Sequence, residues 1–422
     1  MENRELLIGD SDCLPVTCGV PQGSVLGPTL WNLFYDGVLR LPVPAGVKLV
    51  AFADDVAVVA VAHNAELVEQ LVNPALSMIC EWMTVNGLRL APEKSECVVL
   101  TKKRVFRDPV LRVDGCPIAV KRAVRYLGVQ LDTRLSFGKH VDSVTTGARK
   151  AASALGRLMP NVGGPAQCKR SLLMSVVHSR LLYGAAYWAD EVQHVAKYKN
   201  MMLQSQRCAA LRVARCYRTV SDMAALVLAR MPPVTLQAAV RKRATALRKE
   251  GAVLTAQQKE DDTIAHWQVM WDASTKAAWT KSLIPDLRRW WSQGPREISF
   301  HMAQVLTGHG CFQSYLWRRK KAENPGCVHC PAVFDDVEHT VFACPFWDVA
   351  RADVAVALRK PVGPEDVSYL LCGPDPQELP EEPSQRRTII DASTRHRELF
   401  RQMVETILSE KEEMERQRQR QM

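Results

Sequence analysis

The stretch GVKLVAFADDVAVVAVA, residues 46–62, places two adjacent aspartates, Asp54 and Asp55, between two apolar runs. Both runs are rich in β-branched and aromatic residues and have the length of a strand. They predict a buried β-hairpin with the aspartates at or near its tip. Paired carboxylates there suit a hard divalent cation such as Mg²⁺, which two-metal sites use to activate an attacking oxygen and stabilise a leaving one. The alternative is an ordinary turn, because Asp is a common turn residue.

A loop dense in glycine and proline lies upstream of the hairpin, in CGVPQGSVLGPTLWNLFYDGVLRL, residues 18–41. It continues as a predicted amphipathic helix, with Ser24 as a candidate N-cap and Pro28 near the first turn. Glycines beside the start of a helix allow a backbone to approach a nucleotide closely. The predicted apolar face of the helix carries Leu30, Leu33, Phe34, Val38 and Leu41.

Four stretches, in this order along the chain, resemble motifs of reverse transcriptases: PQGSVLGPTLWN, FADD, WMTVNGLRLAPEKSECVVL and YLGVQLD. The first resembles the loop and helix that contact template and incoming nucleotide, and the second resembles the catalytic hairpin. The resemblance implies that Asp54 and Asp55 are catalytic ligands of Mg²⁺, and that Tyr126, Leu127 and Gly128 form a primer grip. It also implies template or nucleotide contacts from Pro21, Gln22, Gly23, Ser24, Phe52 and Lys94.

Later stretches, among them SRLLYGAAYW and LTGHGCFQSYLWRR, resemble the thumb and C-terminal region of non-LTR retrotransposon polyproteins. The similarity is greatest to the arthropod clade that inserts into ribosomal RNA genes. It implies an RNA-directed DNA polymerase that performs target-primed reverse transcription. Its partners would be an RNA template, a DNA primer or target DNA, and deoxynucleoside triphosphates. It would act in the nucleus and bind RNA in the cytoplasm.

One element of that family is missing from the sequence. The palm of these enzymes needs a third carboxylate, on a strand well upstream of the Pro-Gln-Gly loop. The aspartates that precede Pro21 are Asp10 and Asp12, and both are too close to the loop for this role. We therefore expect the chain to be the C-terminal part of a longer polyprotein, and we expect it not to polymerise DNA on its own.

A second constellation lies in CVHCPAVFDDVEHTVFAC, residues 327–344. Its Cys327, Cys330, His339 and Cys344 have the spacing C-x2-C-x8-H-x4-C. Zn²⁺ takes four thiolate or imidazole ligands in a tetrahedron, and four protein ligands leave no open position, so the pattern predicts a structural zinc knuckle. The alternative is four unrelated residues. The adjacent acids Asp335 and Asp336 are interpreted as a solvated turn.

Positive charge is concentrated between residues 192 and 249, which contain twelve Lys or Arg and one acid, Asp222. Charge of one sign over this length indicates contacts to phosphates, because a solvated helix face normally mixes signs. The alternative is a basic surface without a ligand. The candidate nucleic-acid contacts are Arg207, Arg215, Arg218, Arg241, Lys242 and Arg243.

Length and composition are those of a globular chain of several domains. The chain has 422 residues, with 47% hydrophobic and 24% charged, and its net charge of +10 favours an acidic partner. Together with the resemblance, this predicts nucleic acid and no membrane as the partner. We expect no secretory signal, no membrane span and no secretion, and the thirteen cysteines to be reduced thiols apart from the metal site.

The predicted fold class is α+β, a partial reverse-transcriptase palm with an antiparallel sheet followed by mainly helical regions. The predicted segments are a palm remnant over 1–135, a helical thumb over 136–250, a Trp-rich helical connector over 251–318, the knuckle region over 319–360, a mobile linker rich in Pro and acids over 361–386, and a charged C-terminal helix, exposed on most sides, over 387–422. Two other interpretations stay open: a nucleic-acid-binding fragment with an inert palm, and a decayed retrotransposon relic.

Overall fold

The computed structural model describes residues 4–8, 12–16 and 23–421. The chain divides into two compact units. Unit 1 comprises residues 1–126 and 131–135, and unit 2 comprises residues 127–130 and 136–422. The units are connected through the segment 126–136, near the residue where the sequence predicts the end of the first domain.

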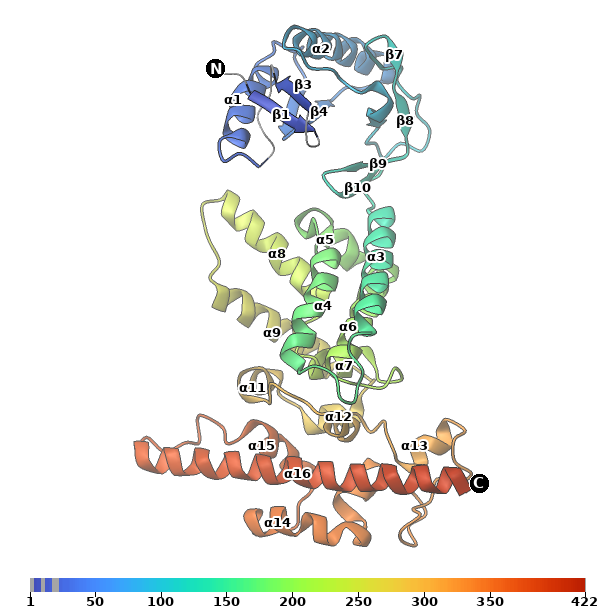
Figure 1. The fold of residues 1–422 in the computed structure, drawn as a ribbon, viewed down its shortest axis with the longest axis vertical. Helices are drawn as coiled ribbons and strands as arrows, with labels where there is room; N and C mark the ends of the chain where they lie inside the picture. The colour runs from blue at the N-terminus through green and yellow to red at the C-terminus, as the bar shows by residue number, and fades with distance from the viewer. Residues whose placement is uncertain (1–3, 9–11, 17–22, 422) are drawn as a thin grey trace. The chain divides into compact units, whose positions relative to one another are not determined.

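Unit 1 combines short strands with the helices α1 and α2 (Figure 1). Its strands form two-stranded sheets, in which β1–β2, β3–β4 and β6–β7 are antiparallel and β5–β8 is parallel. The elements are β1 (Arg4–Ile8), β2 (Asp12–Val16), α1 (Gly27–Leu39), β3 (Val47–Phe52), β4 (Asp55–Ala60), α2 (Ala65–Val85), η1 (Pro92–Lys94), β5 (Glu96–Val98), β6 (Arg112–Val113), β7 (Cys116–Pro117), β8 (Ala119–Lys121), β9 (Ala123–Tyr126) and β10 (Val129–Asp132).

The sheet of unit 1 differs from the single antiparallel palm sheet that the sequence predicts. Within the described residues, the strands do not join into one sheet, and β5 pairs with β8 in parallel. Parallel strands need a long connection between them, and the excursion that carries β6 and β7 supplies it. The coarser prediction of an α+β chain whose later part is mainly helical is confirmed, and its sheets are small.

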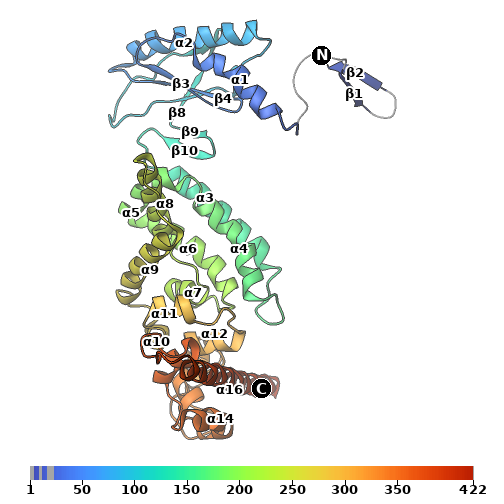
Figure 2. The ribbon, with the colours of Figure 1, turned by 90° about the vertical axis from the view of Figure 1, so that its left-hand side faces the viewer.

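Helix α1 begins later than predicted and buries a narrower face. Its N-cap is Leu26 and not Ser24, although Pro28 lies in the first turn as predicted. Tyr35 and Val38 are buried, whereas Leu33 is 76% exposed. The reason is that α1 and α2 cover only one face of the β3–β4 hairpin (Figure 2), so only the α1 residues that face the hairpin and α2 find apolar partners.

The β3–β4 hairpin, which the sequence predicts to be buried, is buried on one face only. Leu49, Ala51, Val56 and Val58 point toward a core formed with Ile79 and Met83 of α2. The alternate residues of the strands face outward, and Val50, Phe52 and Val59 are between 47% and 64% exposed. Strands alternate their side chains between two faces, and here a single face is covered.

Unit 2 is helical (Figure 1). Its central helix α6 contacts α3, α4, α5, α7 and α8. The elements are α3 (Gly138–Gly156), α4 (Gln167–Leu181), α5 (Ala185–His194), α6 (Ala196–Val213), α7 (Asp222–Leu228), α8 (Val234–Lys249), α9 (Ala256–Asp272), α10 (Ala278–Leu283), α11 (Leu287–Gln293), α12 (Phe300–Thr307), α13 (Gln313–Arg318), η2 (His339–Ala343), η3 (Pro345–Trp347), α14 (Asp348–Leu358), η4 (Pro364–Asp366), α15 (Val367–Cys372) and α16 (Pro383–Gln421). Trp267 and Trp271 are buried, as predicted for core residues.

The C-terminal part of the chain is more ordered than predicted. Residues 361–386 contain α15, whose Val367 and Leu370 are fully buried, so the first half of the predicted linker is part of the core. Helix α16 is exposed over its first ten residues but then runs along α12, α14 and α15 (Figure 1). Its Phe400, Val404 and Ile407 are completely buried, because these residues recur at a spacing of three to four along one face.

None of the helices among the described residues is both long enough and apolar enough to cross a bilayer.

Candidate active site, nucleic-acid interface and metal centre

The paired aspartates lie at the tip of the β3–β4 hairpin. Phe52 pairs with Asp55, which leaves Ala53 and Asp54 as the two turn residues. Ala53 has φ +54°, and a positive φ at the first turn position is the pattern of a type II′ hairpin turn. Both residues are exposed, so both carboxylates are accessible to a ligand.

Two aromatic residues of α1 hold this turn from behind. The indole N–H of Trp31 donates to the carbonyl oxygen of Ala53 at 2.9 Å, and the Tyr35 hydroxyl donates to the carbonyl oxygen of Asp54 at 3.3 Å. The two rings stack with centroids 4.9 Å apart. Burial raises the pKa of Tyr35, and the charges of Asp54 and Asp55 raise it further, so Tyr35 stays a neutral donor. Sequence analysis missed both residues, although their i, i+4 spacing in the helix before the hairpin could have indicated them.

The other predicted palm residues are only partly brought together. Pro21 and Gln22 lie outside the described residues. Gly23 has φ +89°, which side chains other than glycine rarely adopt, and Ser24 precedes α1. Phe52 is 64% exposed beside the aspartates. Lys94 is exposed at the end of η1, and among the described residues it makes no hydrogen bond or ion pair to the hairpin.

The predicted primer grip is a tight turn. Leu127 and Gly128 both have positive φ, at +44° and +81°. The hydroxyl of Tyr183 donates to the carbonyl oxygen of Leu127 at 2.7 Å. The Tyr183 ring passes so close to Gly128 that a Cβ atom there would lie 2.7 Å from it. Glycine is therefore required at 128 by both backbone and packing, and Tyr183 is a further residue that sequence analysis missed.

Two of the predicted nucleic-acid contacts have structural roles. The Arg207 guanidinium donates to the carbonyl oxygen of Val220 at 2.6 and 3.0 Å and also to that of Arg218. The Arg215 guanidinium donates to the carbonyl oxygens of Ile298 and Pro165, both at 3.1 Å, and its side chain is only 13% exposed. Guanidiniums that donate to backbone carbonyl oxygens have fewer donors left for phosphates.

The remaining basic candidates are at the surface. Arg218 and Arg241 are exposed, and Arg241 makes a long hydrogen bond to the carbonyl oxygen of Leu182. Lys242 pairs with Asp190, and Arg243 pairs with Asp262. Both acids lie outside residues 192–249, so folding partly neutralises a stretch that carries nearly one sign of charge in the sequence.

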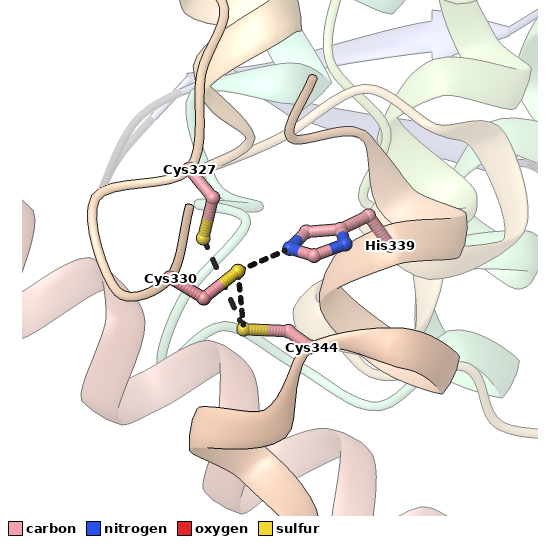
Figure 3. Close-up of side chains that lie close together, drawn as sticks. All are labelled: Cys327, Cys330, His339 and Cys344. Carbon is pink, nitrogen blue, oxygen red and sulfur yellow. Dashed lines mark hydrogen bonds between the residues drawn. The ribbon is translucent and has the colours of Figure 1, made fainter. Parts of the chain in front are cut away.

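The four predicted zinc ligands converge (Figure 3). Their ligand atoms lie within 4.8 Å of one another. The Cys344 sulfur is 3.9 Å from both the Cys327 and the Cys330 sulfur, and the Cys330 sulfur is 3.3 Å from Nε2 of His339. A tetrahedral Zn²⁺ site with Zn–S of about 2.3 Å and Zn–N of about 2.0–2.1 Å requires separations of about 3.8 and about 3.5 Å, so the arrangement fits this ion.

Backbone groups stabilise the loop that carries the first two cysteines. The Cys327 N–H donates to the carbonyl oxygen of Ala332 at 2.9 Å, and the His329 N–H donates to the Cys327 sulfur at 3.4 Å. A backbone hydrogen bond from Ala332 lowers the pKa of Cys330, which favours its thiolate. Burial raises the pKa of the Cys344 thiol to about 12, so Cys344 needs a cation beside it to ionise.

Asp335 is fully buried, which corrects its interpretation as a solvated turn residue. Its carboxylate accepts from Nζ of Lys411 at 2.7 and 2.9 Å, from the Thr340 hydroxyl at 2.5 Å and from the Gln313 N–H at 2.9 Å. Asp336 accepts from the His339 N–H at 2.8 Å. The acidic pair therefore connects the cysteine loop to α13, to α16 and to the candidate zinc ligand His339.

A family model for "Reverse transcriptase (RNA-dependent DNA polymerase)" matches residues 8–131, a range that includes the aspartate hairpin and the helix that holds it. The chain contains a reverse transcriptase domain. No solved structure is significantly similar to the chain.

The reverse transcriptase domain and much of the rest of the chain are similar to polyproteins of arthropod retrotransposons. The "Retrovirus-related Pol polyprotein from type-1 retrotransposable element R1 2" of Nasonia vitripennis is 28% identical over 358 residues, which cover 79% of this chain and 86% of the relative. The "Putative 115 kDa protein in type-1 retrotransposable element R1DM" of Drosophila melanogaster is 28% identical over 353 residues, which cover 79% of this chain but only 34% of the relative. The predicted relationship to non-LTR retrotransposon polyproteins is confirmed.

A third relative is named for an enzymatic activity. The "RNA-directed DNA polymerase from mobile element jockey" of Drosophila melanogaster is 28% identical over 204 residues, which cover 47% of this chain and 22% of the relative. The chain thus spans about a fifth to a third of the length of two of these relatives.

Proposed function

We propose that the chain is the palm, thumb and C-terminal part of an RNA-directed DNA polymerase from a non-LTR retrotransposon. Its substrates are an RNA template, a DNA primer or target DNA, and deoxynucleoside triphosphates. The reaction is target-primed reverse transcription, in which the element's RNA is copied onto a nicked chromosomal end, and this assigns the chain to the nucleus, with RNA binding in the cytoplasm.

The observation that carries the proposal is the aspartate hairpin. Asp54 and Asp55 lie at the tip of a turn fixed by Trp31 and Tyr35, and both carboxylates are exposed. Two adjacent carboxylates offer the hard oxygen donors that Mg²⁺ prefers. Bound Mg²⁺ supplies Lewis-acid activation of the primer hydroxyl and stabilisation of the leaving pyrophosphate. The protein's own contribution is to hold the carboxylates in one orientation, because the turn carbonyls are anchored to α1.

The zinc site supports a structural role at the C-terminal end. Cys327, Cys330, His339 and Cys344 supply four ligands, which leaves no position for substrate. When bound, Zn²⁺ would tie the cysteine loop to η2. Among the predicted nucleic-acid contacts, Arg218 and Arg241 keep guanidiniums at the surface of unit 2, and we propose these two as contacts to the primer–template backbone.

A second candidate function is nucleic-acid binding without polymerisation. It is favoured by one observation: within residues 23–421, no third carboxylate, histidine or cysteine joins Asp54 and Asp55 in a metal-binding group. A polymerase of this chemistry needs the metals held firmly, and two carboxylates hold them weakly.

Primer extension separates the two candidates. The protein is incubated with a DNA primer on an RNA template, all four deoxynucleoside triphosphates, and Mg²⁺ or Mn²⁺. Extension that disappears in both Asp54→Asn and Asp55→Asn supports the polymerase. Salt-sensitive binding of the same hybrid without extension supports the second candidate. If neither extension nor binding occurs, both are wrong.

A further inference from the structure

A basic pocket lies in unit 1, beside the end of the YLGVQLD motif. It has a volume of about 480 Å³ and is lined by Lys103, Arg104, Phe106, Arg122, Thr133 and Arg134, among others. Three separate segments of the chain supply these residues. The family resemblance assigns no role to any of them.

Backbone hydrogen bonds fix the three segments relative to one another. The Thr101 N–H donates to the carbonyl oxygen of Thr133 at 2.8 Å. The Thr133 N–H and hydroxyl donate to the carbonyl oxygen of Arg122 at 3.1 and 3.2 Å. The pocket is therefore part of the folded frame of unit 1.

One of the four cations is held in place by its neighbours. The Arg122 guanidinium makes two hydrogen bonds to the Asp108 carboxylate, at 3.1 and 3.3 Å, and it lies over the Phe106 ring with its carbon 4.7 Å from the ring centroid. The charge of Arg122 is thus neutralised by Asp108, and the Phe106 ring provides an apolar surface beside the guanidinium.

The other three cations lack acidic partners. The side chains of Lys103, Arg104 and Arg134 are exposed, and none of them forms an ion pair with any residue that the structure describes. One acid, Asp132, lines the pocket, and its carboxylate accepts a hydrogen bond from the Arg134 backbone N–H at 3.1 Å. Other exposed cations of unit 1, among them Arg89 and Lys102, also form no ion pair with a described residue, so what distinguishes Lys103, Arg104 and Arg134 is that they surround one concavity.

We propose that this basic pocket binds the phosphate backbone of a nucleic-acid strand, with Lys103, Arg104 and Arg134 as the phosphate contacts. The inference rests on the proposed function, because it assigns to the reverse transcriptase domain a grip on nucleic acid that is separate from its catalytic hairpin. The phosphate backbone of a nucleic acid matches the pocket better than a free anion does. Small-molecule sites bury most of their ligand, whereas these three cations are exposed and spread over two segments, as in electrostatic binding of successive phosphates.

The test is the salt dependence of binding. Fluorescence anisotropy is measured on a labelled RNA–DNA hybrid across a salt series, for the wild type and for Lys103→Ala/Arg104→Ala/Arg134→Ala. Each phosphate contact contributes about −0.9 to the slope of log affinity against log salt on a duplex. Loss of three contacts should therefore flatten the slope by about two to three units.

Two control variants make the result specific. Arg386→Ala/Arg387→Ala/Arg395→Ala removes the same charge from exposed positions of α16 in unit 2, and it should leave the slope unchanged. Arg104→Lys/Arg134→Lys keeps the charge in the pocket, and it should retain most of the wild-type slope. Circular dichroism spectra that match the wild type confirm that each variant folds.

The outcomes distinguish this inference from the proposed function. If the wild type binds the hybrid with a steep slope and the pocket variant has that same slope, the pocket inference is wrong and the proposed function stands. Equal flattening in the pocket and α16 variants also overturns it, because net charge would then explain the effect. Displacement of the hybrid by micromolar pyrophosphate, seen in the wild type and lost in the pocket variant, would identify a small-anion site instead. If the wild type does not bind the hybrid at all, the proposed function itself fails.

Discussion

Replacement of Lys411 by Met should destabilise unit 2 more than any exposed substitution on the same helix. Lys411 and Asp335 are 2% and 0% exposed, and the lysine Nζ lies 2.7 and 2.9 Å from the two carboxylate oxygens. Its third donor goes to the Thr340 hydroxyl at 2.8 Å. Methionine fills a similar volume without the charge, so the variant leaves the Asp335 carboxylate buried without a cation.

The expected magnitude follows from that geometry. Removal of one partner of a buried ion pair costs about 3–5 kcal/mol, because the remaining charge is uncompensated. Asp335 still accepts hydrogen bonds from Thr340 and from the Gln313 N–H, so we expect the lower part of this range, about 3 kcal/mol. Asp335→Asn added to Lys411→Met removes the stranded charge and should recover part of the loss.

Two measurements test this. Denaturant unfolding gives the free energy of unfolding, and hydrogen–deuterium exchange of residues 400–418 in the native protein reports the local stability of α16. Arg401→Met is the matched control on the same helix. Its pair with Glu398 is about half exposed, so it should change the free energy of unfolding by less than about 1 kcal/mol. A loss for Lys411→Met no larger than that of the control would refute the reasoning, as would a double variant less stable than Lys411→Met alone.

The remaining predictions concern the metal, a histidine and an arginine. Protein purified without chelators should contain one Zn²⁺ per chain by elemental analysis, and Cys330→Ser should release it, whereas Cys208→Ser should not. Burial lowers the pKa of His301, but hydrogen bonds to Glu405 and Glu412 outweigh burial and raise that pKa to about 9. The α12–α16 contact should therefore be fully stable below about pH 6.5 and weaken as pH rises through about 9, by at most on the order of 3 kcal/mol, and His301→Gln should abolish this pH dependence of unfolding. Arg207→Ala should lower stability by about 1–3 kcal/mol, because it strands the buried carbonyl oxygen of Val220, while the salt dependence of hybrid binding stays that of the wild type. A normal stability with a flattened salt slope would return Arg207 to the nucleic-acid interface.

Predictions based on residues close together in the sequence agree with the structure. The aspartate hairpin follows from two β-branched runs of strand length around a two-residue turn, and β3 and β4 have this arrangement. The C-x2-C spacing predicts that one turn offers Cys327 and Cys330 together, and folding brings His339 and Cys344 to the same point. Trp31 and Tyr35, which support the aspartate turn, were missed because their partners are backbone carbonyl oxygens, and the i, i+4 spacing of the two residues in α1 is their one sequence signal.

The sequence by itself determined the similarity to non-LTR retrotransposon polyproteins, the hairpin with Asp54 and Asp55, and the set of candidate zinc ligands, since each depends on residue types at fixed local spacing. Only the tertiary structure decided the roles of the charged residues. In the folded chain Arg207 and Arg215 donate hydrogen bonds to backbone carbonyl oxygens. Asp335 is buried against Lys411, which is 76 positions away in the chain. Folding also brought Asp190 and Asp262 to the basic helix α8, and it left Lys103, Arg104 and Arg134 of the basic pocket without ion pairs to any described residue. The physical reason is that the effect of a charge depends on its solvation and on its partners, and both are set by distant segments that folding brings together.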